Sequence, residues 1–260
     1  MHKSGTVTII GRPNVGKSTL LNKLVGTKFS ITSKRPNTTV ECIDYFHADD
    51  KSSIQYYDTP GTIGAIKEIE ADVQVLILEM PFITELDLKM LAIDHDKRIV
   101  VINKADKLKH YQSFYLPFVN SVKEHTSATI LLASAKQGHG IQNIQKLLLE
   151  MLPIDHEPML SESVCGTSKS ELWQLKEIFR EKLFRALHSE LPYQTGVEIE
   201  IIEDVIFVTI LARSLSHKKI IIGSGGRTLS YIRKTATQEL TRFNKTHFKL
   251  KLHVKIMRNP

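Results

Sequence analysis

The sequence of 260 residues contains little cysteine and no long apolar run. Its two cysteines, Cys42 and Cys165, lie far apart in the chain. This excludes a disulfide framework and a cysteine-based metal site, so we expect no disulfide-linked partner. No apolar run approaches the ~18–20 residues that a membrane span needs. An apolar stretch begins already at Thr6, and we expect no signal or transit peptide before it. These absences favour a cytoplasmic protein with reduced cysteines, and the usual ~100–200 residues per domain suggest two domains.

Positive charge is concentrated in the C-terminal third of the chain. The formal net charge is +7, but residues 1–170 hold 19 Lys and Arg against 19 Asp and Glu, whereas residues 171–260 hold 16 against 9. Residues 205–260 contain 12 basic residues and a single acid, Glu239. Such a region suggests a polyanionic partner, for example a nucleic acid. The alternative is a solvated basic face that keeps the protein soluble.

Residues 1–152 alternate short β-branched runs with helical patterns. Strands are expected at residues 6–10, 42–46, 54–57, 73–78, 99–102 and 129–132, and helices at residues 17–25, 86–93, 112–123 and 141–151. This alternation predicts an α/β domain with a mostly parallel sheet and helices on both faces. Residues 153–170 are polar and aperiodic, with two prolines and four serines, and are predicted to form a linker.

Residues 171–260 follow a different pattern, that of an α+β domain. An amphipathic helix is expected over residues 171–190, followed by strands at 197–202 and 205–211, helices at 216–222 and 228–243, and a last strand. In that last strand Leu250, Leu252, Val254 and Ile256 alternate with basic residues, so they should share one buried face. The predicted element order is α-β-β-α-α-β.

The string Gly-Arg-Pro-Asn-Val-Gly-Lys-Ser at residues 11–18 fits the phosphate-binding pattern G-x-x-x-x-G-K-[ST], between an expected strand and an expected helix. Glycines let backbone N–H groups face a phosphate without a Cβ in the way, and the helix N-terminus adds partial positive charge. The expected nucleotide contacts are Gly11, Asn14, Val15, Gly16, Lys17, Ser18 and Thr19. Lys17 would reach the β- and γ-phosphates. The alternative, an ordinary glycine turn, would match all four fixed positions in roughly one such chain in a hundred.

Two further strings suit a metal ion and the γ-phosphate. Asp58 ends an expected strand and would hold Mg²⁺ through water, while the amide of Gly61 would contact the γ-phosphate. A threonine between the first helix and the second strand would complete the magnesium shell. The expected metal ligands are therefore Ser18, Thr38, Thr39 and Asp58.

Two strings at later strand ends suit a guanine base. In Asn103-Lys104-Ala105-Asp106, the carboxylate of Asp106 can accept hydrogen bonds from guanine N1–H and the exocyclic amine together, which adenine cannot offer. A site built for such donors typically rejects the analogue lacking them by ~10⁴ or more. Ser134-Ala135-Lys136 would place a backbone N–H at guanine O6. The sequence thus predicts a domain that binds GTP and GDP.

These motifs resemble those of the translation-factor-related GTPases, and residues 11–19 are typical of bacterial members that act in ribosome assembly. Glu-Ile-Phe-Arg-Glu-Lys-Leu-Phe-Arg at residues 177–185, Glu-Leu-Pro-Tyr at 190–193 and Val-Glu-Ile-Glu at 197–200 are similar to the Era family of bacterial GTPases. The resemblance covers nearly the whole chain. It implies a P-loop NTPase G domain over residues 1–152 and a type II KH domain over residues 171–260. It also implies that the protein binds the 3′ end of small-subunit ribosomal RNA during maturation of the 30S subunit.

A KH domain clamps the backbone of about four nucleotides with a G-x-x-G loop. Gly223-Ser224-Gly225-Gly226 fits this loop, between two expected helices and among basic residues. The expected RNA contacts are Lys218, Lys219, Ile222, Gly223, Ser224, Gly225, Gly226, Arg227, Arg233 and Lys234. The alternative for the glycines alone is a helix cap.

Thr62 follows Gly61, so no glutamine is available there to orient the attacking water. The resemblance instead implies a potassium ion, bound with the help of Asn14, that acts as a fixed cation. The expected catalytic residues are then Asn14, Lys17, Thr39 and Gly61, and hydrolysis is expected to be slow and stimulated by potassium.

Three features depart from the Era pattern. Only ten residues separate Gly61 from Asp72, so most of the switch II helix is expected to be missing. Ser224 stands where the family usually has a lysine or another polar residue, and the chain stops at Pro260 without the family's C-terminal extension. A short switch II would also suit a guanine-nucleotide-regulated RNA chaperone that does not hydrolyse GTP. A third alternative is a GTPase that acts peripherally at the inner membrane or in the stress response, with an incidental basic face.

Overall fold

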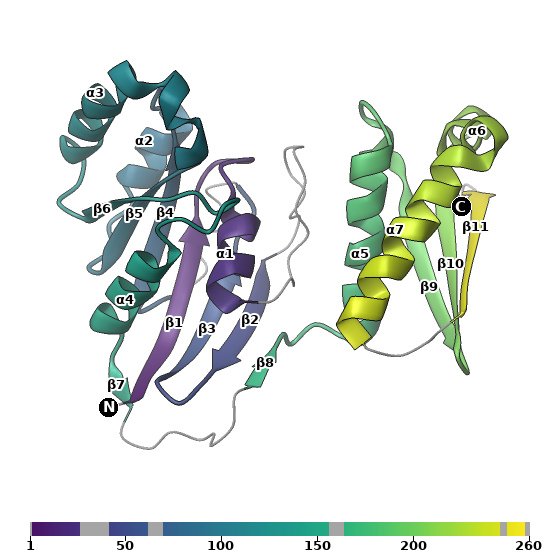
Figure 1. Ribbon diagram of the computed structural model, residues 1–260, viewed down its shortest axis with the longest axis horizontal. Helices are drawn as coiled ribbons and strands as arrows, with labels where there is room; N and C mark the ends of the chain where they lie inside the picture. The colour runs from purple at the N-terminus through teal and green to yellow at the C-terminus, as the bar shows by residue number, and fades with distance from the viewer. Residues whose placement is uncertain (1, 27–41, 62–69, 156–163, 245–248, 258–260) are drawn as a thin grey trace. The chain divides into compact units, whose positions relative to one another are not determined.

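The computed structural model describes residues 2–26, 42–61, 70–155, 164–244 and 249–257. These residues fold into two compact units, unit 1 up to Ser168 and unit 2 from Lys169 onward (Figure 1). The strands of unit 1 are β1 (His2–Ile10), β2 (Ile43–Ala48), β3 (Ser52–Asp58), β4 (Val73–Glu79), β5 (Arg98–Asn103), β6 (Thr129–Leu132), β7 (Ile154–Asp155) and β8 (Val164–Gly166). Its helices are α1 (Lys17–Val25), α2 (Glu85–Leu91), the 3₁₀ helix η2 (Ala105–His110), α3 (Gln112–Lys123) and α4 (Ile141–Met151).

The strands of unit 1 form one sheet in the order β6-β5-β4-β1-β3-β2-β8, with β7 paired to β1. Neighbouring strands from β6 to β3 are parallel, whereas β2 pairs antiparallel with β3. The α/β fold with a mostly parallel sheet is therefore confirmed. Because the carboxyl ends of parallel strands meet at one edge, the loops after β1, β3, β4, β5 and β6 gather there.

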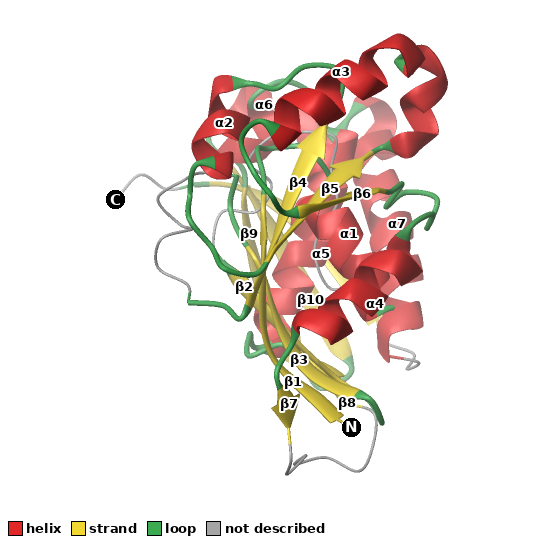
Figure 2. Ribbon diagram, turned by 90° about the vertical axis from the view of Figure 1, so that its left-hand side faces the viewer, coloured by secondary structure: helices red, strands yellow, loops and turns green. Residues whose placement is uncertain are grey.

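Helices cover both faces of this sheet, so its central strands are buried throughout. Every residue of β5 is buried, as is β4 up to Leu78, which is typical of parallel strands between two helical layers. The side chains of α2 and α3 pack on one face with Leu76, Leu78 and Val100, while α1 and α4 pack together on the other (Figure 2). This core holds the loop-bearing edge rigid.

Helix α2 is shorter than the predicted helix over residues 86–93. A capping box between Thr84 and Asp87 starts it one residue earlier. At its other end the buried guanidinium of Arg98 donates hydrogen bonds to the carbonyl oxygen of Leu91, at 2.8 Å, and to that of Ile93. The side chain of Arg98 from β5 thus satisfies the carbonyl of Leu91, the last residue of the helix, where a further helical turn would otherwise do so.

The prediction that residues 153–170 are only a linker was wrong. β7 pairs antiparallel with His2 and Lys3, at the end of β1 that β4 does not reach, and β8 pairs antiparallel with β2. The backbone N–H and hydroxyl of Ser168 both donate to Asp44, at 3.2 and 2.6 Å. Exposed strand edges offer unpaired backbone groups to any neighbouring segment. Sequence periodicity does not detect such pairing, and the described residues of the segment up to Ser168 belong to unit 1.

Unit 2 has the predicted order α-β-β-α-α-β. Its elements are α5 (Glu171–Ala186), the 3₁₀ helix η3 (Leu191–Gln194), β9 (Gly196–Ile202), β10 (Val205–Ala212), α6 (Leu215–Ile222), η4 (Ser224–Gly226), α7 (Arg227–Asn244) and β11 (Lys249–Ile256). The sheet order is β11-β10-β9, with β10 parallel to β11 and antiparallel to β9. α5 ends four residues before the predicted Glu190, because Leu187 is extended and buries its side chain.

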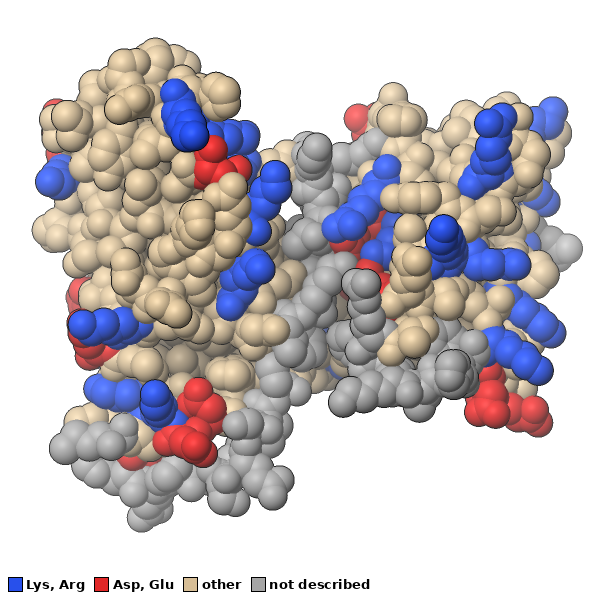
Figure 3. Space-filling model, viewed as in Figure 1, with Lys and Arg blue, Asp and Glu red and all other residues tan. Residues whose placement is uncertain are grey.

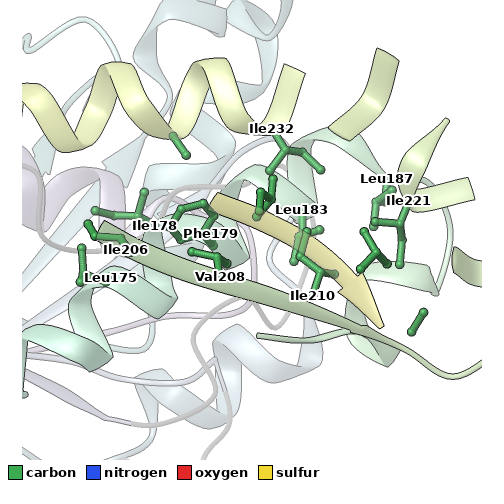
Figure 4. Close-up of a cluster of buried hydrophobic side chains, with 14 of the residues drawn as sticks. Leu175, Ile178, Phe179, Leu183, Leu187, Ile206, Val208, Ile210, Ile221 and Ile232 are labelled. Atoms are coloured by element: carbon green, nitrogen blue, oxygen red, sulfur yellow. The ribbon is translucent and has the colours of Figure 1, made fainter. Parts of the chain in front are cut away.

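The core of unit 2 lies between its helices and its sheet (Figure 4). Phe179 of α5, Val208 and Ile210 of β10 and Ile232 of α7 are fully buried in it. In β11 the predicted apolar face holds for Leu252 and Val254, but Ile256, at the strand end, is exposed. Among the described residues, no helix has the length and apolar character that crossing a membrane would require.

Candidate functional site

The loop between β1 and α1 adopts a backbone that few side chains tolerate. Gly16, with φ +106°, has no room for a Cβ, which would lie 2.3 Å from Asn103 Nδ2. Asn14 has φ +67°, a left-handed conformation that asparagine accepts more readily than most residues. A Cβ on Gly11 would likewise meet the Ile77 carbonyl oxygen at 2.5 Å. These residue types are therefore required by the loop's shape, and an ordinary glycine turn would not need them all.

Lys17 begins α1 and is almost completely buried, as is Val15 before it. Its Nζ donates to the carbonyl oxygens of Gly11, at 2.7 Å, and Arg12, at 3.2 Å. Burial lowers the pKa of Lys17, and the nearby charge of Asp58 partly opposes that shift. The ammonium group of Lys17, held in this way by its own loop, is positioned to bind an anion at the N-terminus of α1.

Ser18 and Asp58 come together at the same end of α1. Ser18 Oγ donates to Asp58 Oδ2 at 2.7 Å, and the carboxylate is fully buried at the end of β3. Thr19 follows in the same first turn of α1. Next to Asp58, the Thr59 hydroxyl donates to the Ile9 carbonyl at 2.8 Å, and Gly61 packs so closely on Pro13 that a Cβ would lie 2.6 Å from it.

A hydroxyl and a carboxylate at this spacing are hard oxygen donors of the kind that Mg²⁺ prefers. The residues present therefore fit the expected ion. The other two expected ligands, Thr38 and Thr39, lie outside the described residues, and so do Thr62 and most of the segment in which switch II is expected to be shortened.

Asn103, at the end of β5, joins two loops. Its Nδ2 donates to the Val15 carbonyl at 2.7 Å, and its Oδ1 accepts from the Ala135 amide at 2.9 Å. Both bonds are buried, and Asn103 itself is 3% exposed. The loop after β1 and the loop after β6 are therefore held at a fixed separation by one amide side chain.

Asp106 and Ser134 form the pair at the other end of this edge. Ser134, fully buried, donates its hydroxyl to Asp106 Oδ1 at 2.6 Å. That hydrogen bond is the main reason why the pKa of Asp106 lies below its ordinary value, and Lys136 and Lys107 add smaller electrostatic contributions. Asp106 is thus kept as a carboxylate, an acceptor for two donors on one ligand edge.

Sequence analysis missed a connection through Glu79, at the end of β4. Its carboxylate accepts from Lys104 Nζ at 2.6 Å and from Lys107 Nζ at 3.4 Å, while its carbonyl accepts from Arg12 at 3.1 Å. Arg12 also pairs with the buried carboxylate of Asp87 at 3.2 Å. Glu79 is the last residue of β4, as Asp58 is of β3 and Asn103 is of β5. Its position at the end of an expected parallel strand could therefore have marked it as a site residue.

In unit 2 the string Gly-Ser-Gly-Gly forms a short, open turn between α6 and α7. Gly223 is needed for packing, because its Cβ would lie 2.3 Å from Thr228 Oγ1. Gly225 and Gly226 have φ +58° and +75°, and a Cβ on either would meet nothing within 4 Å. Arg227 folds back on the turn and donates to the Ser224 carbonyl at 3.2 Å. The backbone of this turn is open to a ligand.

Basic side chains surround the turn. Lys219, Arg227, Arg233 and Lys234 are exposed, Lys218 and Ile222 are half-buried, and the visible surface of unit 2 carries far more basic than acidic residues (Figure 3). The expected RNA contacts therefore come from α6, the turn and the first half of α7.

Ser134→Ala should raise the pKa of Asp106 toward its ordinary value, because the hydroxyl that favours the charged carboxylate is removed. In the unmodified protein the stabilisation from this pair is present above the unfolded-state pKa and is lost as the pH falls through the lower, folded-state pKa. Carboxyl ¹³C NMR titration measures the shift. Asp49, which accepts from Ser52 and Lys51 instead, is the internal control. An unmoved Asp106 titration would contradict this account.

Comparison with protein families supports the division of the chain. Residues 6–160 match the family described as "50S ribosome-binding GTPase", and residues 178–260 match the KH domain family. The first of these matches covers more than half of the chain.

Individual proteins called GTPase Era are similar to this chain over almost its whole length. The chain is 37% identical over 284 residues to the GTPase Era of Neisseria meningitidis serogroup C, covering 98% of this chain and 90% of the relative. The GTPase Era of Xylella fastidiosa strain M12 is 34% identical, with 99% and 93% covered.

Two solved structures are similar along the whole chain. One is Era in complex with MgGDPNP and nucleotides 1506–1542 of 16S ribosomal RNA, with a TM-score of 0.88, 30% identity, and 100% of this chain and 95% of that chain covered. The other is a point variant of Aquifex aeolicus Era bound to GDP and AlF₄⁻, with a TM-score of 0.87, 31% identity, and 99% and 95% covered. The geometry agrees with these comparisons, because the chain has a phosphate-binding loop before α1, a hydrogen bond between Ser18 and Asp58, and an open glycine turn in a KH fold. The chain belongs to the Era family of GTPases.

Proposed function

We propose that this GTPase depends on Mg²⁺ and binds the 3′ end of small-subunit ribosomal RNA through unit 2 during assembly of the 30S subunit in the cytoplasm. One observation carries the proposal. The chain matches, over its full length, an Era structure that holds both MgGDPNP and a 16S RNA fragment. The described parts of two regions support it: the loops at the edge of the sheet in unit 1 and the open turn of unit 2.

The phosphate end of the nucleotide would lie on the loop before α1. The backbone N–H groups of Gly11, Asn14, Val15 and Gly16 supply donors, Lys17 neutralises the β- and γ-phosphates, and Ser18 and Thr19 begin the helix. Mg²⁺, when bound, would neutralise negative charge on the phosphate groups. Ser18 and Asp58 would hold it, together with Thr38 or Thr39.

Hydrolysis by such a site depends on positioning and electrostatics, because phosphoryl transfer needs little covalent chemistry from the protein. Lys17 would stabilise charge on the γ-phosphate oxygens, and the amide of Gly61, whose residue packs closely on Pro13, would donate to the same group. Asn14 is exposed on the loop and offers its amide oxygen to a cation.

We therefore expect GTP hydrolysis in single-turnover assays to be at least about tenfold faster in KCl than in NaCl at matched ionic strength, since a fixed cation stabilises developing charge. Asn14→Ala should remove this difference, because it takes away the amide oxygen proposed to hold the cation. Equal rates in the two salts would contradict the proposed potassium site. No turnover in either salt would favour the non-hydrolysing RNA chaperone.

The base end of the nucleotide would lie between Asp106 and the loop after β6. Asp106 would accept from guanine N1–H and the exocyclic amine. In the loop after β6 the Ala135 amide already donates to Asn103 and the Ser134 amide to His139, so the donor to O6 would be the amide of Lys136. Asn103 sets the distance between base and phosphate sites, and Lys104, held by Glu79, lies beside Asp106 in the chain.

Asp106→Asn should exchange guanine preference for xanthine preference, because the amide presents one donor and one acceptor where the carboxylate presented two acceptors. By calorimetry, GTP affinity should fall about a hundredfold or more and XTP affinity should exceed it. Asp96→Asn, the same substitution at an exposed residue outside the site, is the control and should change GTP affinity little. ATP bound as tightly as GTP by the unmodified protein would contradict guanine specificity.

RNA would meet unit 2 at the open turn. Phosphates could approach the backbone at Gly225 and Gly226, where a Cβ would meet no neighbour, although the Gly226 N–H itself donates to the Gly223 carbonyl at 3.0 Å. The surrounding residues would supply charge and apolar contact: Lys218, Lys219, Ile222, Gly223, Ser224, Arg227, Arg233 and Lys234. The affinity should fall steeply with salt, as phosphate contacts require.

Gly225→Asp should reduce affinity for a 16S 3′-end RNA at least about tenfold, because it sets a negative charge where a phosphate is expected. Aspartate tolerates the left-handed backbone and its Cβ meets no neighbour, so the fold should persist. Gly225→Asn has the same shape without the charge and should retain most of the affinity. Fluorescence anisotropy measures both, and equal binding by all three proteins would overturn the RNA proposal.

A further inference from the structure

Helix α7 presents two different faces. Ile232, Ala236 and Leu240 are buried at four-residue spacing and pack into the core of unit 2. Arg227, Tyr231 and Lys234 are exposed and recur at i, i+4 and i+7, so they lie in one row along the helix. The row begins at the open turn, where Arg227 is hydrogen-bonded to Ser224.

Tyr231 in this row has no evident part in folding. Half of its surface, 50%, is exposed, and among the described residues no hydrogen bond or ring contact engages its side chain. Tyr193, the other clearly exposed tyrosine of unit 2, differs because its ring stacks edge-on against Phe184 with centroids 4.9 Å apart. A large ring left open at the surface is more typical of a contact with a partner.

The charges around Tyr231 select an anionic partner. Arg227 and Lys234 flank it along the row, and Arg233, which is also exposed, adds positive charge on another part of the helix surface. The only acid of residues 205–260, Glu239, forms an ion pair with the buried Lys182 of α5 and does not offset these charges. In the view of Figure 3, the charged side chains on the visible surface of unit 2 are mostly Lys and Arg, set among uncharged residues.

We propose that single-stranded RNA leaving the glycine turn continues along α7, stacks one base on Tyr231 and places phosphates beside Arg227 and Lys234. This rests on the proposed RNA-binding function and extends its footprint beyond the G-x-x-G loop. From Arg227 to Lys234 the helix rises about 10 Å, enough to accompany roughly two or three nucleotides at ~3.4 Å spacing.

RNA fits this row better than a protein segment does. A protein interface needs a contiguous apolar centre, whereas Tyr231 is a single ring between cations. An aromatic platform with flanking cations is the arrangement that binds single strands, because every base has a face to stack and every nucleotide a phosphate. Stacking tolerates any base, so Tyr231 adds affinity without strong sequence preference.

Anisotropy with single-stranded RNAs of four and eight nucleotides, at several salt concentrations, tests the proposal on the full chain. Tyr231→Ala should weaken the eight-nucleotide RNA by about 5- to 100-fold, the range of one lost stacking contact, with an unchanged salt slope. Tyr231→Phe should bind the eight-nucleotide RNA with the affinity of the unmodified protein, since the ring is kept. Lys234→Ala should instead reduce the salt slope by about 0.7, the value for one phosphate contact on a single strand.

Gln238→Ala, an exposed substitution one turn further along α7, is the matched control and should bind like the unmodified protein. Circular dichroism and GTP binding verify that each variant is folded. If Tyr231→Ala binds the eight-nucleotide RNA normally while Gly225→Asp loses it, the α7 path is wrong and RNA binding at the turn stands. If Gly225→Asp also binds normally, both proposals fail. Loss of binding to a protein partner, with RNA affinity intact in Tyr231→Ala, likewise overturns the α7 path.

Discussion

The nucleotide site depends on one buried amide side chain. Parallel strands bring the loops after β1, β3, β5 and β6 to a common edge, but an edge alone leaves their separation undetermined. Asn103 sets it, because it donates to the loop before α1 and accepts from the loop after β6, at 2.7 and 2.9 Å. Inside a protein an unmet polar group is costly, so both bonds are strongly held. The distance between phosphate and base recognition is thereby built in before any ligand arrives.

A second group of contacts braces this arrangement from the side. Glu79 joins Lys104, near the base end of the site, to Arg12 in the phosphate loop. Arg12 also pairs with Asp87 in the first turn of α2. The end of β4 is thus tied to the loops on both sides of it. A nucleotide bound here would meet a rigid frame, so less of its binding energy is spent on ordering the site.

Unit 2 uses a different principle. Its glycine turn leaves room for a ligand, because Gly225 and Gly226 carry no side chain that would cover the backbone. Gly223 allows close packing against Thr228 at the start of α7. The α7 row then adds charge and one aromatic ring without covering the turn. A site of this kind suits a flexible polyanion, whereas the walled site of unit 1 suits one compact ligand.

Most of the architecture was predictable because its causes are local. α1, α3 and α4 span the residues that periodicity indicates, and the strings at residues 11–18, 103–106 and 134–136 stand at strand ends as expected. The β7 and β8 pairings and the C-terminal limit of α5 were missed, because each depends on a partner far away in sequence.

The sequence by itself determined the chemistry on offer: which residues can bind phosphate, a cation, guanine or an RNA backbone, and the order in which the elements carry them. Only the tertiary structure decided which of those groups meet. It paired Ser18 with Asp58 and Asp106 with Ser134, and it brought Lys104, Lys107 and Arg12 to Glu79. It left Tyr231 exposed while it buried Ile232, the next residue. Residue spacing encodes local periodicity, whereas these pairings arise when distant segments pack against a common core.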